Sequence, residues 1–177
     1  YMHERVKYLP FADVWDEYLK RQGLCEDWWD EVEKFETEVI EFKEAKNDFS
    51  FEELGKYFSA LSNEANLHNV ECAWLVFGVE DKKHKVVGTN YRLDDKSLNN
   101  LKEEIAKHTT GNISFIEIYK CSRKDQDSND KRILVFQIPA APKGIPTAFK
   151  SINYGRDGEA LVGLSTEEFE RIRSQNV

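Results

Sequence analysis

Three glutamates stand close together in the stretch ETEVIEFK, at Glu36, Glu38 and Glu41. Glu80 and Asp81 follow the apolar run AWLVFGV further along the chain. Carboxylate oxygens are the ligands that Mg²⁺ and Mn²⁺ prefer, and such an ion can activate water and stabilise charge on a phosphate under attack. This acidic set is a candidate metal site, and the alternative is a solvated acidic surface.

Local structure decides whether Glu36 and Glu41 can act together. Successive side chains point to opposite faces of a strand, so carboxylates five positions apart diverge in an ideal strand. A change from helix to strand near Thr37 would allow them to converge, and the pattern of elements places a junction there. The near-continuous apolar run AWLVFGV predicts a central strand, and Glu80 and Asp81 come at its C-terminal end, where sheet edges commonly expose functional groups.

Two helices are expected before this acidic stretch. FADVWDEYLKRQG has apolar residues at helical spacing, and CEDWWDEVEKFE opens with acids suited to a helix N-terminus. Three of the four tryptophans lie here. We expect residues 1–35 to form an acidic, Trp-rich helical extension that packs on the main body. Alternatively, this pair of helices is a docking surface for another chain, including a second copy in a homodimer.

Residues 36–177 are expected to form an α+β domain, with a mixed, mostly antiparallel sheet flanked by helices. The order of elements is not a regular βαβ alternation. Ser50 with Glu53, and Ser165 with Glu168, have capping-box spacing. The apolar stripe of the middle helix is Leu98, Leu101 and Ile105, and residues 122–131 are expected to be a polar hairpin tip. Strands are expected at 38–45, 73–81, 84–91, 113–121, 132–140 and 146–158, and helices at 51–66, 94–109 and 165–175.

Composition excludes several functional classes. The chain has 177 residues, enough for one well-buried core. It contains neither an apolar signal region nor a run of about 20 apolar residues, so we expect a cytoplasmic protein with no membrane partner. Cys25, Cys72 and Cys121 form no CxxC, which disfavours a disulfide framework or structural zinc. GxGxxG, GxxxxGK[ST] and GxSxG are all missing from the sequence, so a nucleotide site has no local support.

Charge is unevenly distributed. The net charge is -8, and residues 1–40 hold 11 acidic and 5 basic side chains. The rest of the chain is nearly balanced. Strong nonspecific binding to DNA usually requires a basic surplus, because phosphate neutralisation dominates that affinity. A nucleic-acid role would therefore need a local basic face.

Several motifs, in order, resemble the Schlafen AlbA_2 domain family. They are EFKEAKNDFSFEELGKYFSALSNEANL, AWLVFGVEDKKHKVVGTNYR and FKSINYGRDGEALVGLSTEEFERI, and the resemblance covers residues ~36–175. Bacterial members are described as nucleic-acid-binding modules of transcriptional regulators, often followed by further domains of a longer chain. Mammalian Schlafen proteins that cleave tRNA and rRNA use two glutamates of ExxxxEFK and an acidic residue after the GV strand. The resemblance thus implies catalytic and metal-binding roles for Glu36, Glu41 and Glu80, with Asp81 as the neighbouring alternative.

Basic side chains near these motifs are candidate contacts to nucleic acid. The set is Lys43, Lys46, Lys82, Lys83, Arg92 and Arg156, the last because the family places the GRDG turn near the same groove. A second basic stripe, Lys120, Arg123, Lys124, Lys131 and Arg132, flanks the long hairpin. Such side chains could follow the phosphates of a nucleic acid despite the negative net charge. The alternative is that they are ordinary solvated residues that balance nearby acids.

Three functions follow from these observations. The first is a nucleic-acid-binding domain of a bacterial transcriptional regulator, with DNA or RNA as its partner. The second is an endoribonuclease that acts on structured RNA with Mg²⁺ or Mn²⁺ held by Glu36, Glu41 and Glu80. The third is a protein-interaction module that acts through the N-terminal helices. The sequence leaves open whether the chain is an enzyme.

Overall fold

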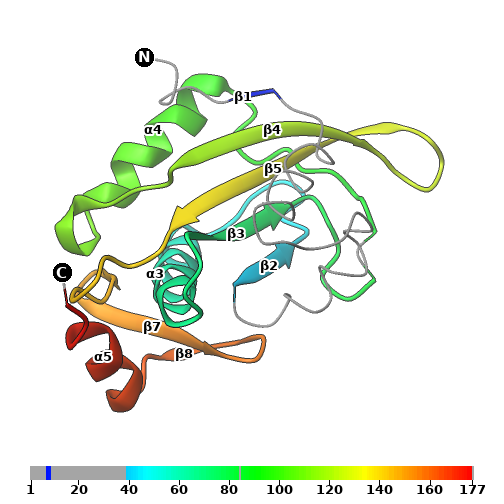
Figure 1. The fold of residues 1–177 in the computed structure, drawn as a ribbon. Helices are drawn as coiled ribbons and strands as arrows, with labels where there is room; N and C mark the ends of the chain where they lie inside the picture. Colours follow the sequence, from blue (N-terminus) through cyan, green and yellow to red (C-terminus); the bar gives the residue numbers. More distant parts are fainter. Residues whose placement is uncertain (1–6, 9–38, 84, 177) are drawn as a thin grey trace.

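The computed structural model describes residues 7–8, 39–83 and 85–176 (Figure 1). The two expected N-terminal helices, and with them the extension 1–35, lie outside the described residues. The strands are β1 Lys7–Tyr8, β2 Ile40–Lys43, β3 Cys72–Phe77, β4 Glu117–Lys124, β5 Asp130–Pro139, β6 Ala148–Phe149, β7 Ile152–Asp157 and β8 Ala160–Gly163. The helices are α3 Phe51–Leu67, α4 Asp95–Ala106, α5 Thr166–Arg173 and the short 3₁₀ helix η2 Thr110–Asn112.

Two sheets make up the strand layers of the described chain. The larger has the order β1-β4-β5-β3-β2, and the smaller has the order β6-β7-β8. In the larger sheet β5 pairs antiparallel with β3 and β4, whereas the outer pairs β1–β4 and β2–β3 are parallel. The smaller sheet is antiparallel throughout. The predicted α+β fold with a mixed, mostly antiparallel sheet is therefore confirmed.

Helix α3 lies between the two sheets (Figure 1). Its apolar stripe, Leu54, Phe58 and Leu61, is fully buried. The predicted central strand is also confirmed, because every residue of β3 is buried between β2 and β5. Helix α4 lies along β4 and buries its predicted stripe of Leu98, Leu101 and Ile105 (Figure 1).

The predicted helix starts agree with the structure. The Ser50 side chain accepts a hydrogen bond from the Glu53 backbone N–H at 3.3 Å, as an N-cap residue does. Ser165 and Glu168 form a complete capping box at the start of α5. Among the described residues, no helix combines the length and the apolarity that a membrane span requires.

Two strand predictions need correction, and one strand was missed. Of the predicted strand 84–91, the described residues 85–91 form no regular strand: Gly78 O accepts from both Val87 N and Gly88 N, and one isolated bridge joins Val79 to Val86. Residues 146–158 are not one strand but two, β6 and β7, which are joined at Lys150 and Ser151 with positive φ angles of 48° and 70°. Strand β8 was not predicted.

The polar hairpin tip is shorter than predicted. Strands β4 and β5 continue to the pair Lys124–Asp130, so half of residues 122–131 belong to the sheet. The remaining turn is closed by the Asp125 carboxylate, which accepts from the backbone N–H groups of Asp127 and Asn129 at 2.9 Å each. The polar composition of residues 122–131 predicted that the segment is exposed, but it did not predict the backbone conformation.

Candidate functional site

Strands β2 and β3 end at the same edge of the large sheet. They pair in parallel from Ile40 opposite Trp74 to Lys43 opposite Phe77. Beyond these ends lies a hollow of about 380 Å³, which we call the edge hollow. Its lining residues are Phe42, Lys43, Glu44, Glu80, Asp81 and Lys82. The structure therefore brings Glu80 and Asp81 to the strand end that follows Glu41, as the sequence suggested.

A glycine turns the chain at this edge. Gly78 has a φ of +98°, and its N–H bonds the carbonyl of Lys43 at 2.9 Å. A Cβ at this position would lie 2.9 Å from Ile133 Cδ1 and 3.1 Å from Arg132 O, closer than side chains pack. Only glycine combines this backbone conformation with this approach. The turn directs the chain into Glu80 and Asp81.

The Glu41 side chain is buried beneath the hollow, with 3% of its surface exposed. One carboxylate oxygen accepts a hydrogen bond from Nη2 of Arg156, and the other lies 3.3 Å from Nζ of Lys43. Burial raises the pKa of Glu41 above its ordinary value, the nearby charge of Asp81 adds to the rise, and Arg156 and Lys43 oppose it. Glu41 is thus a costly buried charge with two cations beside it.

Arg156 joins the small sheet to this edge. Only 2% of the residue is exposed, and its Nη1 donates to the carbonyl of Ile40 at 3.0 Å. Nη2, besides contacting Glu41, donates to the carbonyl of Glu159 at 3.3 Å. The backbone N–H of Arg156 donates to Glu64 of helix α3 at 3.0 Å. Its Nε finds no hydrogen-bond partner among the described residues.

The buried polar face of α3 was not foreseen from the sequence. Asn63 Nδ2 donates to the carbonyls of Thr147 at 2.9 Å and Tyr154 at 2.8 Å, and its Oδ1 accepts from Thr147 N at 2.7 Å. Ser59 Oγ donates to the same Thr147 carbonyl at 2.7 Å. The motif SNEAN, which carried part of the family resemblance, here fixes the strands that present Arg156. The polar residue types of this motif alone would favour exposure to solvent.

Lys43 is held at the wall of the edge hollow. Its side chain is 30% exposed, and its Nζ lies 5.0 Å from the centre of the Tyr57 ring. Burial lowers the pKa of Lys43, but a hydrogen bond with Tyr57 and the charge of Glu41 outweigh burial, so the pKa stands above its ordinary value. The ammonium group is therefore charged and restrained.

The other predicted nucleic-acid contacts fall into two groups. Lys82 and Lys83 are exposed, with no ion pair recorded for them within residues 39–83 and 85–176. Lys46 is 62% exposed and 3.7 Å from Glu44. In contrast, Arg92 is bound by Glu104 through both guanidinium ends, at 2.7 and 3.0 Å. Arg92, like Arg156, is engaged inside the protein, and its contact with nucleic acid stays a prediction.

The second basic stripe is also largely engaged. Lys120 is buried and paired with Asp95, and Arg132 donates to the carbonyls of the segment 89–92. Lys124 pairs with Asp130 at 2.8 Å. These residues hold α4 and the hairpin in place. Of the amines in the predicted sets, Lys82 and Lys83 are exposed without an ion pair among the described residues, and Lys82 lines the edge hollow.

The predicted metal ligands are only partly described. Glu36 lies outside the described residues, so the set of Glu36, Glu41 and Glu80 cannot be placed as a whole. Within the described part of the chain, no three His, Cys, Asp or Glu side chains are arranged to hold an ion. Glu80 and Asp81 are half-buried at the rim, whereas Glu41 faces Arg156. The metal site stays a prediction.

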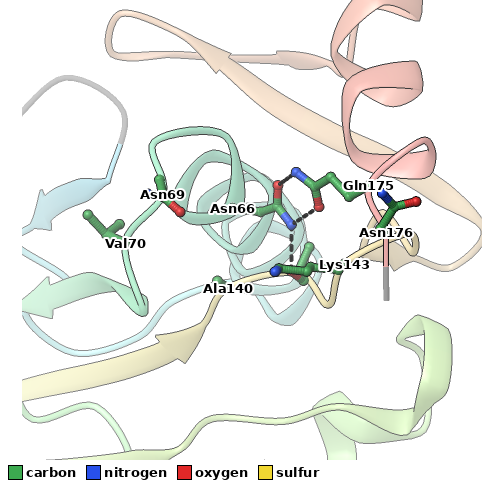
Figure 2. A pocket seen from close by; sticks show the side chains of 8 residues that line it. Asn66, Asn69, Val70, Ala140, Lys143, Gln175 and Asn176 are labelled. Carbon is green, nitrogen blue, oxygen red and sulfur yellow. Dashed lines mark hydrogen bonds between the residues drawn. The ribbon is translucent and has the colours of Figure 1, made fainter.

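A second hollow, of about 390 Å³, lies where α3, α5 and the segment after β5 meet (Figure 2). Asn66 Nδ2 donates to Gln175 Oε1 at 2.8 Å and to the carbonyl of Ala141 at 2.8 Å. Gln175 Nε2 returns a hydrogen bond to Asn66 Oδ1 at 2.7 Å. We call this cluster of Asn66, Gln175 and the Ala141 carbonyl the amide joint. Sequence inspection did not identify it.

Comparison with known proteins gives two results. Residues 36–165 match the family described as Schlafen, AlbA_2. The crystal structure of the DIP2311 protein from Corynebacterium diphtheriae is similar, with a TM-score of 0.52 and 17% sequence identity. That match covers 79% of this chain but 28% of that chain, so this chain spans less than a third of its structural neighbour. At this identity the likeness concerns the fold alone.

Proposed function

We propose that this chain, which belongs to the Schlafen AlbA_2 family, binds nucleic acid at the edge hollow. The observation that carries the proposal is a set of four amines: Lys43 and Lys82 line the hollow, Lys46 lies 3.7 Å from the lining residue Glu44, and Lys83 directly follows Lys82. We call this set the lysine rim. Lys82 and Lys83 are exposed and unpaired among the described residues, and Lys43 is kept charged by its neighbours.

The chemistry of the rim suits a phosphate backbone that passes over the hollow. Ammonium groups bind phosphate oxygens without regard to sequence, and they supply affinity that falls with salt. The carboxylates of Glu44, Glu80 and Asp81 between the lysines repel phosphates from the interior of the hollow. They can instead accept hydrogen bonds from the amino groups of bases, as Asp and Glu do with cytosine. Phosphates would therefore lie outside and base edges inside.

The finer role, in a transcriptional regulator that recognises DNA, rests on the resemblance to bacterial members of the family. Nothing in the rim distinguishes DNA from RNA, because amines contact the phosphates that both polymers share. An endoribonuclease would require Glu41 to leave Arg156 in order to hold an ion. For these reasons binding without metal is the first property to measure, and DNA and RNA belong in the same experiment.

Fluorescence anisotropy with labelled single- and double-stranded DNA and RNA, in the presence of EDTA, tests the proposal. We expect affinity to fall as salt rises between about 50 and 200 mM. The double variant Lys82→Gln/Lys83→Gln should reduce the slope of log affinity against log salt by about 2, one for each lost phosphate contact. Circular dichroism and urea unfolding would show that the variant remains folded.

A matched control removes the same charge elsewhere. Lys96 and Lys107 are exposed on and next to α4, which lies beside β4, and two strands separate β4 from β2. The double variant Lys96→Gln/Lys107→Gln should leave the salt slope unchanged. The absence of binding at low salt would contradict the proposal. Equal slopes for the two double variants would contradict the assignment to the lysine rim.

A further inference from the structure

The Glu41 carboxylate is surrounded as it would be in a cation-binding site, but the cations beside it are side chains of the protein itself. Its carboxylate is 3% exposed, and each oxygen faces a cationic nitrogen, from Arg156 on one side and Lys43 on the other. A buried carboxylate needs such compensation, because the loss of its hydration costs several kcal/mol. Compensation can come from a metal ion or from a side chain, and here two side chains provide it.

Arg156 is fixed in this position by groups other than Glu41. Its guanidinium donates to the carbonyls of Ile40 and Glu159, and its backbone N–H is held by the buried carboxylate of Glu64. Three segments, β2, the β7–β8 turn and α3, therefore restrain one residue. A mobile surface arginine could leave Glu41 for another partner. One that is 2% exposed and held at both ends cannot leave without disturbing β7.

The remaining acids at the edge offer a poor alternative for a divalent ion. Glu80 and Asp81 line the hollow together with Lys43 and Lys82. An ion held by these two carboxylates would lie beside two ammonium groups, whose charge repels it. Mg²⁺ and Ca²⁺ sites normally surround the ion with oxygen donors and not with amines. The described residues thus do not fit a tightly bound divalent ion at Glu41.

We propose that Arg156 is a built-in counter-ion that occupies the cation position at Glu41. The carboxylate then serves to attach the β7–β8 hairpin to the end of β2, and to orient Lys43, without binding Mg²⁺ or Mn²⁺. This inference concerns the buried pair and does not depend on nucleic-acid binding at the lysine rim. Either proposal can fail while the other stands.

The Arg156 Nε–H group provides a direct probe in ¹H–¹⁵N NMR. This N–H is buried and has no hydrogen-bond partner among the described residues, so its signal should exchange slowly with water and report on the adjacent ion pair. The signal is assigned by its loss in Arg156→Lys. Addition of MgCl₂ alone to the wild-type chain should leave it in place. Glu41→Gln, which keeps an oxygen acceptor, should shift it by more than a linewidth.

A control variant and two contrary outcomes make the test decisive. Glu44→Gln removes an exposed carboxylate that lines the same hollow and should leave the Arg156 signal unchanged. A saturable shift of the wild-type signal on titration with Mg²⁺ would overturn the proposal, because it would show the ion competing for Glu41. An unchanged signal in folded Glu41→Gln would also overturn it. Should Glu41→Gln fail to fold, the wild-type titration alone decides.

Discussion

The edge hollow and the hollow at the amide joint are similar in size, but the first is lined by charged side chains and the second is closed by neutral ones. Their volumes are about 380 and 390 Å³. In the amide joint the neutral side chains of Asn66 and Gln175 bind each other in both directions (Figure 2). At the edge hollow the side chains are charged: Glu41 pairs with Arg156 and Lys43 in the interior, whereas Lys82 at the surface is exposed without an ion pair among the described residues. Volume therefore does not distinguish the two hollows, and the proposal of a binding site rests on the exposed charge.

The buried charged pair and the partly buried amide pair also differ in what their loss should cost. A neutral amide left without its partner loses hydrogen bonds whose net value is modest. A charged group left buried without its partner keeps its full cost of desolvation. If the two regions are built as described, substitutions at the charged pair should be far more damaging than those at the amide pair, and removing both charges together should repair the damage.

Arg156→Met should produce the largest effect. It leaves the Glu41 carboxylate buried without its principal cation, and we expect a loss of about 3–5 kcal/mol in the free energy of unfolding. Urea denaturation followed by circular dichroism measures it. The chain should also lose the attachment of the β7–β8 hairpin, so that amide hydrogen exchange in β7 accelerates more than in β3.

The double variant Glu41→Gln/Arg156→Met tests the cause of that loss. Replacement of both members of a buried ion pair is often neutral or stabilising, because it removes two desolvation costs at once. We expect the double variant to regain most of the stability lost by Arg156→Met alone. If the losses in unfolding free energy of the two single variants add up to the loss of the double variant, the two residues are not paired, because additivity is the behaviour of independent sites.

Asn66→Ala should have a smaller effect, at the amide joint. It removes two donated hydrogen bonds and one accepted bond, leaving the Ala141 carbonyl and the Gln175 amide without partners. We expect a loss of about 1–3 kcal/mol in unfolding free energy with no change in nucleic-acid affinity. Asn176→Ala is the matched control, since Asn176 lines the same hollow but is exposed. It should change stability by less than about 0.5 kcal/mol.

A drop in nucleic-acid affinity for Asn66→Ala, with Asn176→Ala unaffected, would count against the comparison. It would mean that the amide joint contributes to binding and is not only a structural contact between α3 and α5. Equal destabilisation by the two variants would show that the reciprocal hydrogen bonds have no special value. Urea denaturation and fluorescence anisotropy on the same protein samples separate these outcomes.

Local sequence signals predicted the elements well where the cause was local. Ser165 with Glu168 predicted a helix start, because a cap depends on residues three positions apart. Leu98, Leu101 and Ile105 predicted a buried stripe from helical periodicity alone. The apolar run of β3 likewise predicted a central strand. Each of these features is decided by neighbours along the chain.

The candidate site was predictable only in part, because its decisive contacts join distant segments. The family resemblance grouped Glu41 with Glu80, and the parallel register of β2 and β3 brings the ends of their two strands to one sheet edge. The family resemblance placed the GRDG turn near the same groove, but it did not indicate that Arg156 pairs with Glu41, 115 positions away. The same limit applies to Asn63, whose partners Thr147 and Tyr154 are 84 and 91 positions distant. Polar side chains were expected in solvent, and tertiary pairing instead buried them.

The pH dependence of stability should show the smallest effect. Burial raises the pKa of Glu41 above its ordinary value of 4.5, so the folded chain holds this proton at a higher pH than the unfolded chain does. The stability contributed by the protonated carboxyl is full below the unfolded pKa, and it is lost as pH rises through the folded pKa.

Glu41→Gln cannot titrate and lacks this dependence. The wild-type stability minus that of Glu41→Gln should therefore fall as pH rises across this window, measured by urea denaturation at a series of pH values. A difference that rises with pH would show that Arg156 and Lys43 outweigh burial, and the charged pair would then stabilise the fold in its own right.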